Sequence, residues 1–265
     1  MARSKEAELL ALAEDAAAAA AAELTSRFGG GAQGVRSKSS PTDLVSDADV
    51  AAEAAIRSVI SAAYPDDAII GEEEGETGAG ERCWVVDPLD GTINFLFGIP
   101  VFAVSIACED RDGALAAIVL DPVREERFTA TRSGAAALNG EPIAASERDD
   151  LASALVATGF AYEASVRARQ AEVVSRVLPR VRDIRRAGAA ALDLCWCACG
   201  RYDAYYERGV HAWDVAAGTL IAQRAGLTVR RLEAAGEDAQ GLLAAPRAIV
   251  EELYRLVDGT GRGGA

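Results

Sequence analysis

The sequence predicts a protein of the mixed α/β (α+β) class whose two halves are organised differently. In the first half, two long helical patterns are followed by a series of short apolar runs typical of strands. In the second half, strand-like and helix-like patterns alternate, which indicates an α/β unit. With 265 residues, half of them hydrophobic, the chain is long enough for one large domain or two smaller ones.

The first half begins with a helix over residues 4–28, where apolar residues recur at helical spacing and a run of alanines favours helix. Ser46 is expected to cap a second helix, with Asp49 three residues later, and the Tyr-Pro pair at 64–65 ends it. An Asn-Gly pair at 139–140 is typical of a hairpin turn. The strands of this half are expected at residues 68–71, 83–86, 102–108, 114–120 and 127–132.

The pattern changes near residues 147–151, so we expect an N-terminal domain of residues 1–148 and a C-terminal domain of residues 149–265. Pro246 is expected to start the last helix of the chain. The other predicted elements of this half are strands at 155–158, 183–186, 203–207 and 228–232, and helices at 165–178, 189–199 and 213–225.

The charge and the apolar pattern exclude several classes of protein. The 27 basic and 41 acidic residues give a net charge of 27 − 41 = −14, which repels phosphate backbones, so nucleic acid is not an expected partner. No uncharged apolar run approaches about 20 residues, so we expect no transmembrane helix and no membrane partner. Glu6 and Glu8 interrupt the N-terminal segment, which therefore does not resemble a signal peptide, and the cytoplasm is the expected compartment.

Three of the five cysteines alternate in the segment CWCAC, at Cys195, Cys197 and Cys199. Zinc sites usually combine cysteines two residues apart with histidines, and this chain has one histidine. We therefore expect buried, reduced thiols that act as small apolar residues. A redox or metal-binding role is the alternative.

The segment WVVDPLDGTINF carries two carboxylates to the end of an apolar strand. The strand predicted at 83–86 delivers Asp87 to its carboxyl end, where α/β folds place ligands. Pro88 fixes one φ angle, and the chain is expected to fold back so that Asp90 faces Asp87. Two carboxylates this close repel unless a cation lies between them or a proton is shared. Oxygen ligands without a neighbouring His or Cys favour Mg²⁺ or Mn²⁺.

Other acidic residues in the chain are candidates for the same cation. Glu72 follows a short strand, Asp214 opens a predicted helix, and Asp49 lies in the first turn of another. Gly91 and Thr92 would offer backbone N–H groups to an anion next to the metal. The structural alternative is that the Asp-Gly pair is a turn and Asp87 a capping residue, and that Asp49 and Asp214 stabilise helix N-termini.

Taken together, the motifs GEEEG, WVVDPLDGTINF and HAWDVAAGTLIAQRAG, with SSPTDLVSDAD and RRAGAAALDLCWCACGRYDAYYERG, resemble the inositol monophosphatase family of Mg²⁺-dependent, lithium-sensitive sugar phosphatases. The resemblance covers nearly the whole chain, and DPLDGT combined with a distant Trp-Asp helix is specific. It implies a layered αβαβα sandwich, two or three bound Mg²⁺ ions and a homodimer. It also implies hydrolysis of a phosphate monoester by an activated water, without a covalent phosphoenzyme.

The resemblance assigns metal ligands residue by residue. Glu72, Asp87 and the carbonyl of Leu89 match ligands of a first metal. Asp87, Asp90 and Asp214 match ligands of a second metal, with Asp87 bridging the two. A third, weaker Mg²⁺ is expected near Glu72, which is also a candidate catalytic residue.

Further roles follow from the same resemblance. Thr92, hydrogen-bonded to Asp49, matches the pair that orients the attacking water, and Lys38 matches a basic residue in a mobile loop near the metals. His211 is either a contact at the edge of the substrate site or a hydrogen-bonding residue at the entry of its helix. The positions that match substrate contacts are Asp90, Gly91, Thr92, Gly188, Ala189, Ala190 and Glu207.

The substrate expected from the resemblance is myo-inositol 1-phosphate, because the carboxylate of Glu207 can accept hydrogen bonds from ring hydroxyls. The alternatives within the family are fructose 1,6-bisphosphate, histidinol phosphate and phosphoadenosine phosphate. A binding module with an idle pocket is an alternative of another class. A lost ligand carboxylate would favour that alternative, but all four are present.

Overall fold

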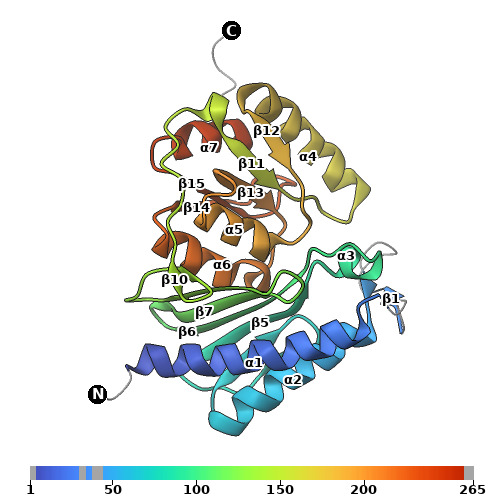
Figure 1. Cartoon of the computed structure of the whole chain (residues 1–265). Helices are drawn as coiled ribbons and strands as arrows, with labels where there is room; N and C mark the ends of the chain where they lie inside the picture. The colour runs from blue at the N-terminus through green and yellow to red at the C-terminus, as the bar shows by residue number, and fades with distance from the viewer. Residues whose placement is uncertain (1–3, 30–33, 38–43, 260–265) are drawn as a thin grey trace.

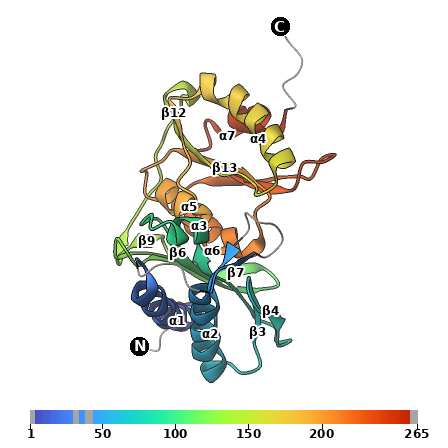
Figure 2. The same ribbon diagram turned by 90° about the vertical axis from the view of Figure 1, so that its right-hand side faces the viewer.

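The computed structural model describes residues 4–29, 34–37 and 44–259 and arranges them in five layers, αβαβα, as the resemblance implied (Figures 1 and 2). From the bottom of Figure 1 upwards, a helix pair, a large sheet, a second helix pair, a small sheet and a third helix pair follow one another. The pairs are α1 (Lys5–Arg27) with α2 (Asp47–Ala63), α5 (Ala190–Ala198) with α6 (Ala212–Arg224), and α4 (Ala164–Val177) with α7 (Val250–Asp258).

Serine side chains cap both N-terminal helices, and the cap at Ser46 is the predicted one. The hydroxyl of Ser4 accepts a hydrogen bond from the N–H of Ala7 at the start of α1. At the start of α2, Ser46 and Asp49 form a capping box, in which the N–H of Ser46 donates to Asp49 Oδ2 over 2.9 Å. The capping box therefore fixes the position of Asp49, which is fully buried.

The large sheet lies on α1 and α2, and its β3–β5 pair is the parallel one, while the other pairs are antiparallel. Its strands, in spatial order, are β10 (Glu141–Pro142), β9 (Ala137–Leu138), β8 (Glu126–Thr131), β7 (Gly113–Asp121), β6 (Ala103–Asp110), β5 (Cys83–Asp90), β3 (Ala68–Gly71) and β4 (Gly75–Thr77). The predicted turn at 139–140 joins β9 and β10, with positive φ angles of 52° at Asn139 and 87° at Gly140. The helix α3 (Thr92–Leu96) follows β5, and β1 (Arg36–Ser37) pairs with β2 (Leu44–Val45).

The small sheet belongs to the second half of the chain. Three of its five strands run parallel to one another, and the other two form a hairpin that pairs with them in the antiparallel direction. In spatial order the strands are β12 (Asp183–Arg185), β11 (Leu155–Thr158), β13 (Ala204–Arg208), β15 (Gly241–Ala245) and β14 (Thr228–Leu232). Short 3₁₀ turns, η1 (Leu151–Ser153) and η2 (Leu178–Arg180), precede β11 and follow α4. The chain passes from the large to the small sheet near residue 150, and the division into two domains there stays a prediction.

Clusters of buried apolar side chains fill the spaces between the layers. The cluster between α1–α2 and the large sheet contains Leu24 and Ile56, and the cluster between the large sheet and α5–α6 contains Phe128 and Leu192. On the small sheet, Tyr205 packs toward α5 while Tyr206, the next residue, packs toward α4 and α7. The middle helices α5 and α6 therefore pack through apolar side chains against both sheets, which fixes their N-termini between the two sheets.

Several boundaries differ from the sequence prediction. Strand β5 continues to Asp90 rather than ending at residue 86, and strands β4 and β15 were not predicted. The last helix begins at Val250 and not at Pro246, because the N–H of Val250 and of Ile249 first close a turn on the Pro246 carbonyl. The five cysteines are free thiols; Cys108, Cys195 and Cys197 are buried in apolar clusters, as expected, whereas Cys83 and Cys199 are partly exposed. Among the described residues, no helix has both the length and the apolar character to cross a membrane.

Candidate active site

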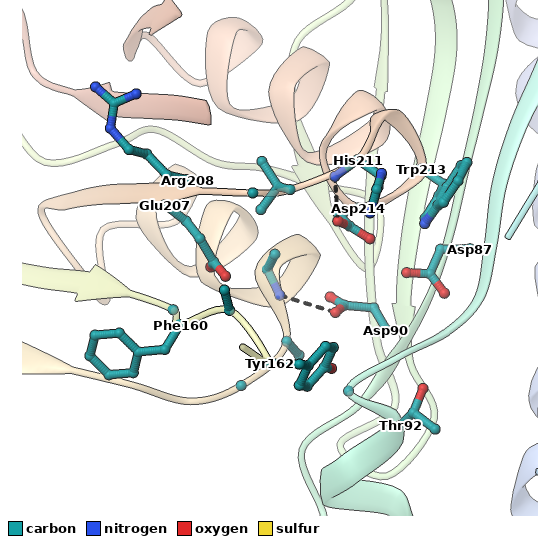
Figure 3. A pocket seen from close by; sticks show the side chains of 18 of the residues that line it. Asp87, Asp90, Thr92, Phe160, Tyr162, Glu207, Arg208, His211, Trp213 and Asp214 are labelled. Carbon is teal, nitrogen blue, oxygen red and sulfur yellow. Dashed lines mark hydrogen bonds between the residues drawn. The ribbon is translucent and has the colours of Figure 1, made fainter. Parts of the chain in front are cut away.

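A cavity of about 390 Å³ lies where the large sheet meets the small sheet and the middle helices. Its wall includes the turn after β3, the end of β5, the N-termini of α5 and α6, the end of β13 and the loop between β11 and α4. Figure 3 shows the carboxylates of Asp87, Asp90 and Asp214 pointing into the same space, with Glu207 facing it from β13. Segments far apart in the sequence thus bring their acidic side chains to one place.

An irregularity in β5 explains why Asp87 and Asp90 both face this cavity. In a regular strand, residues three apart point to opposite faces of the sheet. In β5, Asp87 pairs with Ser105 and Asp90 pairs with Ala103, so that three steps on β5 oppose two steps on β6. This bulge adds one residue and brings both carboxylates to the same side. The chain does not fold back at Pro88, as the sequence analysis expected; it continues along the sheet.

The carboxylates are close enough to raise one another's pKa. Burial raises the pKa of Asp87 well above its usual range, and the charges of Glu72, Asp90 and Asp214 raise it further. Burial and the charge of Asp214 likewise raise the pKa of Asp90. A cation in the cavity would relieve this repulsion.

The carboxylate of Asp90 is held by the N-terminus of α5. Its Oδ1 accepts a hydrogen bond from the N–H of Ala190 over 3.1 Å, and its Oδ2 accepts one from the N–H of Ala191 over 2.7 Å. The first N–H groups of a helix have no partner within the helix, and a carboxylate suits them. These bonds fasten the end of β5 to the second half of the chain.

Thr92 and Asp49 form a buried hydrogen-bonded pair beside the bulge. Thr92 Oγ1 lies 3.1 Å from Asp49 Oδ1 and 3.0 Å from the carbonyl oxygen of Leu89. Asp49 Oδ2 in turn accepts hydrogen bonds from the N–H and hydroxyl of Ser46. The orientation of Thr92 is therefore determined by the first turn of α2 and by the bulged strand.

Gly91, between Asp90 and Thr92, must be glycine for this geometry. Its φ angle is +98°, in the left-handed region that other residues rarely adopt. A Cβ atom there would also lie 2.9 Å from the carbonyl oxygen of Val101, so the neighbouring backbone leaves no room for a side chain. Gly91 lines the cavity and lets its wall approach closely.

The start of α6 supplies Asp214 and an aromatic pair. Asp214 Oδ2 accepts a hydrogen bond from the N–H of His211 over 2.7 Å, which fixes its carboxylate at the helix N-terminus. The rings of His211 and Trp213 stack with centroids 4.8 Å apart. His211 is thus a helix-entry residue by its backbone, and its exposed side chain also lines the cavity. Trp213 lines the cavity as well.

Glu207 faces the metal-ligand candidates from β13. Its Oε2 accepts a hydrogen bond from the hydroxyl of Tyr205 over 2.9 Å. Burial raises the pKa of Glu207 to about 7, and the charge of Asp214 adds to the rise while Arg186 opposes it. A Cβ atom on Gly159 would lie 2.1 Å from this carboxylate, so a glycine is needed behind Glu207. The arrangement presents a carboxylate oxygen to a hydroxyl-bearing ligand.

In the absence of metal, the protein is expected to lose stability as the pH rises from about 4.5 to about 7. Because the folded-state pKa of Glu207 is raised, the folded protein binds more protons than the unfolded chain in this range, and the free energy of unfolding falls as those protons leave. Since solvent reaches Glu207 through the cavity, its share of the loss is at most about 3 kcal/mol. Urea unfolding in EDTA at several pH values measures it. Glu207→Gln should reduce the pH slope, and an unchanged slope would contradict this assignment.

The structure brings nearly all the predicted site residues to this cavity. Asp49 lies behind the wall, in contact with Thr92, and Lys38 lies outside the described residues. The predicted residues that line the cavity are Glu72, Asp87, Leu89, Asp90, Gly91, Thr92, Gly188, Ala189, Ala190, Glu207, His211 and Asp214.

Sequence reasoning missed part of the wall. Phe160 and Tyr162, in the loop after β11, line the cavity, although no motif singled them out. Arg186, which precedes the N-terminus of α5, also lines it. Only their position near the carboxyl end of a predicted parallel strand could have indicated these residues.

The donor set fits hard divalent cations. As the side chains stand, the described part of the chain contains no group of three or more His, Cys, Asp or Glu residues arranged to hold a metal ion. This agrees with the electrostatics, because carboxylates without a cation repel, and those of Asp90 and Asp214 bind backbone N–H groups. Carboxylate and carbonyl oxygens around one cavity are nevertheless the ligands that Mg²⁺ prefers. Burial raises the pKa of Asp87, and the charges of Glu72, Asp90 and Asp214 raise it further, so a cation placed among these carboxylates would be attracted by all of them.

Comparisons with known proteins agree with the site. The family model described as "Inositol monophosphatase family" matches residues 5–260. The inositol-1-monophosphatase SuhB of Mycobacterium tuberculosis is 41% identical over 93% of this chain and 92% of its own length. The Nus factor SuhB of Pseudomonas aeruginosa is 47% identical over 69% of this chain and 70% of its own length.

Solved structures share the fold. The extragenic suppressor protein suhB from Bartonella henselae superposes with a TM-score of 0.88 at 34% identity, covering 97% of this chain and 100% of that one. The Thermotoga maritima IMPase superposes with a TM-score of 0.86 at 28% identity, covering 95% of this chain and 97% of that one.

Proposed function

The chain belongs to the inositol monophosphatase family and is a phosphoric monoester hydrolase, and from this premise we propose that it hydrolyses myo-inositol 1-phosphate in a Mg²⁺-dependent reaction. The observation that carries the proposal is the convergence of Asp87, Asp90, Asp214 and Glu72 on one cavity beside the Thr92–Asp49 pair. The products would be inositol and inorganic phosphate.

Two or three Mg²⁺ ions would be held by the acidic wall. Glu72, Asp87 and the Leu89 carbonyl would hold one, and Asp87, Asp90 and Asp214 would hold another. When bound, the ions would supply positive charge that activates a water and neutralises the phosphate and leaving oxygens. This charge also explains how a protein with a net charge of −14 accepts an anionic substrate.

The chain's own residues would orient the reactants. With its hydroxyl hydrogen donated to Asp49, the Thr92 oxygen has lone pairs that would accept a hydrogen bond from a water in the cavity and so orient it. The backbone N–H groups of Gly91 and Thr92 would bind the phosphate at the start of α3. Asp90, fastened by α5, keeps the two halves of the site at a fixed distance.

Glu207 supports a polyol substrate in particular. Its carboxylate lies across the cavity from the metal-ligand candidates and can accept hydrogen bonds from neighbouring ring hydroxyls. Gly188, Ala189 and Ala190 offer a small-residue wall beside it, where a ring can approach closely. Arg186, which lines the same wall, places a positive charge near the path of a phosphate ester.

The test is a phosphate-release screen with Mg²⁺ and with EDTA. The substrates are myo-inositol 1-phosphate, fructose 1,6-bisphosphate, histidinol phosphate and phosphoadenosine phosphate. We expect the highest kcat/KM with the inositol ester, no release in EDTA, and inhibition by Li⁺. Preference for another ester would overturn the substrate assignment and leave the class of reaction standing.

A second candidate function is that of an interaction protein, because a relative 47% identical is named a Nus factor. Retention of all four carboxylates favours catalysis. Binding to a partner protein together with absence of turnover at millimolar Mg²⁺ would favour the second candidate. The homodimer and the cytoplasmic location stay predictions.

A further inference from the structure

Glu53 and Arg57 form a buried ion pair on α2 that the mechanism does not use. Glu53 is fully buried and Arg57 is 9% exposed, and neither lines the cavity. Arg57 Nε donates to Glu53 Oε1 over 2.8 Å, one helical turn apart. A buried ion pair adds little net stability, since desolvation of the charges offsets their attraction, so its presence calls for another reason.

The carboxylate of Glu53 binds the backbone that follows Glu72 and lies close to the backbone that precedes it. Its Oε2 accepts a hydrogen bond from the N–H of Glu73 over 2.8 Å, and its Oε1 accepts one from the N–H of Glu74 over 3.0 Å. On the other side of Glu72, a Cβ atom on Gly71 would lie only 2.3 Å from Glu53 Oε1. The absence of a side chain at Gly71 therefore lets the carboxylate reach into the turn.

Arg57 extends the same contact to strand β4. Its Nη1 donates to the Thr77 hydroxyl over 2.8 Å, and its Nη2 donates to the Gly75 carbonyl over 2.6 Å. Strand β4 is the edge of the large sheet, has three residues and is exposed along its length. Because an edge hairpin this short is weakly supported by its own pairing with β3, the bonds from the two α2 side chains add to its attachment to the body of the protein.

We propose that Glu53 and Arg57 are positioning residues for Glu72, acting through its backbone to hold its carboxylate where it serves as a metal ligand. The inference rests on the proposed function, in which Glu72 is a ligand. Ligand carboxylates need to be held within about 0.5 Å of the productive geometry, and Glu72 lies in the turn that leads into the short, exposed edge strand β4. The adjacent carboxylates of Glu73 and Glu74 repel that of Glu72 and each other. Against this repulsion, Glu53 holds the turn by accepting hydrogen bonds from two of its N–H groups, and Arg57 forms an ion pair with Glu74.

The test compares Glu53→Gln with wild type by calorimetric titration of Mg²⁺ into the substrate-free protein. Glutamine keeps the shape but offers one acceptor oxygen in place of two, so one N–H of the turn, or Arg57, loses its partner. We expect the Mg²⁺ dissociation constant to rise by about 10- to 100-fold, the range seen when groups behind metal ligands are removed. At saturating Mg²⁺, kcat should recover to within about threefold of wild type, because the catalytic groups are intact.

Asp67→Asn is the matched control. Asp67 is also a buried carboxylate. It accepts hydrogen bonds from the guanidinium of Arg82 and from the indole N–H of Trp84, but it lies at the opposite end of β3. This variant should lower the melting temperature and leave the Mg²⁺ dissociation constant unchanged. If Asp67→Asn weakened Mg²⁺ binding as much as Glu53→Gln does, loss of the fold's stability would explain both and the positioning role would be wrong.

Two more variants keep the inference separable from the proposed function. Arg57→Lys retains the charge but loses the fork that reaches Gly75 and Thr77, and it should weaken Mg²⁺ binding less than Glu53→Gln. It also provides the measurement if Glu53→Gln does not fold. Glu72→Gln should weaken Mg²⁺ binding most. If wild type bound no Mg²⁺, the proposed function would fail; if Glu72→Gln weakened binding and Glu53→Gln and Arg57→Lys did not, the positioning role alone would fail.

Discussion

Asp90→Asn is expected to lower kcat/KM for the phosphate ester by at least about 10²–10³-fold while the protein stays folded. Asp90 is buried and is held by two N–H groups of α5, so its charge has a fixed position beside Asp87 and Asp214. Asparagine keeps the size of the side chain and one acceptor oxygen but removes a negative ligand from the cation that neutralises the transition state. Phosphate release at saturating Mg²⁺ measures the loss.

The stability of the same variant distinguishes a lost ligand from a damaged fold. Because burial and Asp214 raise the pKa of Asp90, removal of its charge relieves repulsion, which offsets the loss of one hydrogen bond of about 1 kcal/mol. The metal-free variant should therefore unfold within a few degrees of wild type, while the rise in melting temperature on adding Mg²⁺ should be smaller. The control is Asp193→Asn. Asp193 is a buried acidic residue in α5, three residues after Ala190, and it does not line the cavity. Wild-type turnover and a wild-type response to Mg²⁺ in Asp90→Asn would show that this carboxylate is not a ligand.

Local patterns predicted the fold where the information is local. The helices α1 and α2 have apolar stripes, α2 begins at the predicted cap Ser46, and the hairpin at 139–140 has an Asn-Gly pair, which favours a positive φ at both residues. Strand β15, with the sequence GLLAA, has weak strand propensity and exists because β13 and β14 pair with it from both sides. Strand β4 contains glycine and exposed polar residues, and its contacts to Arg57 are not visible in its own sequence. These elements depend on tertiary contacts, which no local pattern contains.

The site was predictable as a set of residues but not as a geometry. Resemblance grouped Asp87, Asp90 and Asp214, whereas strand periodicity alone would place the first two on opposite faces. The bulge that brings them together follows from the pairing of β5 with β6, which the periodicity of β5 alone does not describe. The role of Glu53 was hidden for a similar reason, because its partners in the turn lie twenty residues away and its helix position lies beside the apolar stripe.

Thr92→Val is expected to lower kcat by about 10²-fold or more, with a change of no more than a few-fold in the Mg²⁺ concentration that gives half-maximal activity. Valine has nearly the same shape, so the buried space is still filled, but it has no hydroxyl to bridge Asp49 and the attacking water. The Leu89 carbonyl oxygen, which lies beside the Thr92 hydroxyl, loses this neighbour in the variant. It keeps both lone pairs and its place as a candidate metal ligand. Phosphate release at several Mg²⁺ concentrations separates the two quantities.

The hydroxyl, and not the bulk, is responsible if Thr92→Ser retains most of the turnover that Thr92→Val loses. Asp49→Asn should act through the same pair, so its effect and that of Thr92→Val should not add in the double variant. Additive losses would mean that Asp49 serves the site through Ser46 and the start of α2 and has no part in moving the proton of the water. A Thr92→Val enzyme whose whole defect disappears at high Mg²⁺ would point to the Leu89 carbonyl, and the threonine would then be a support for a metal ligand and not a partner of the water.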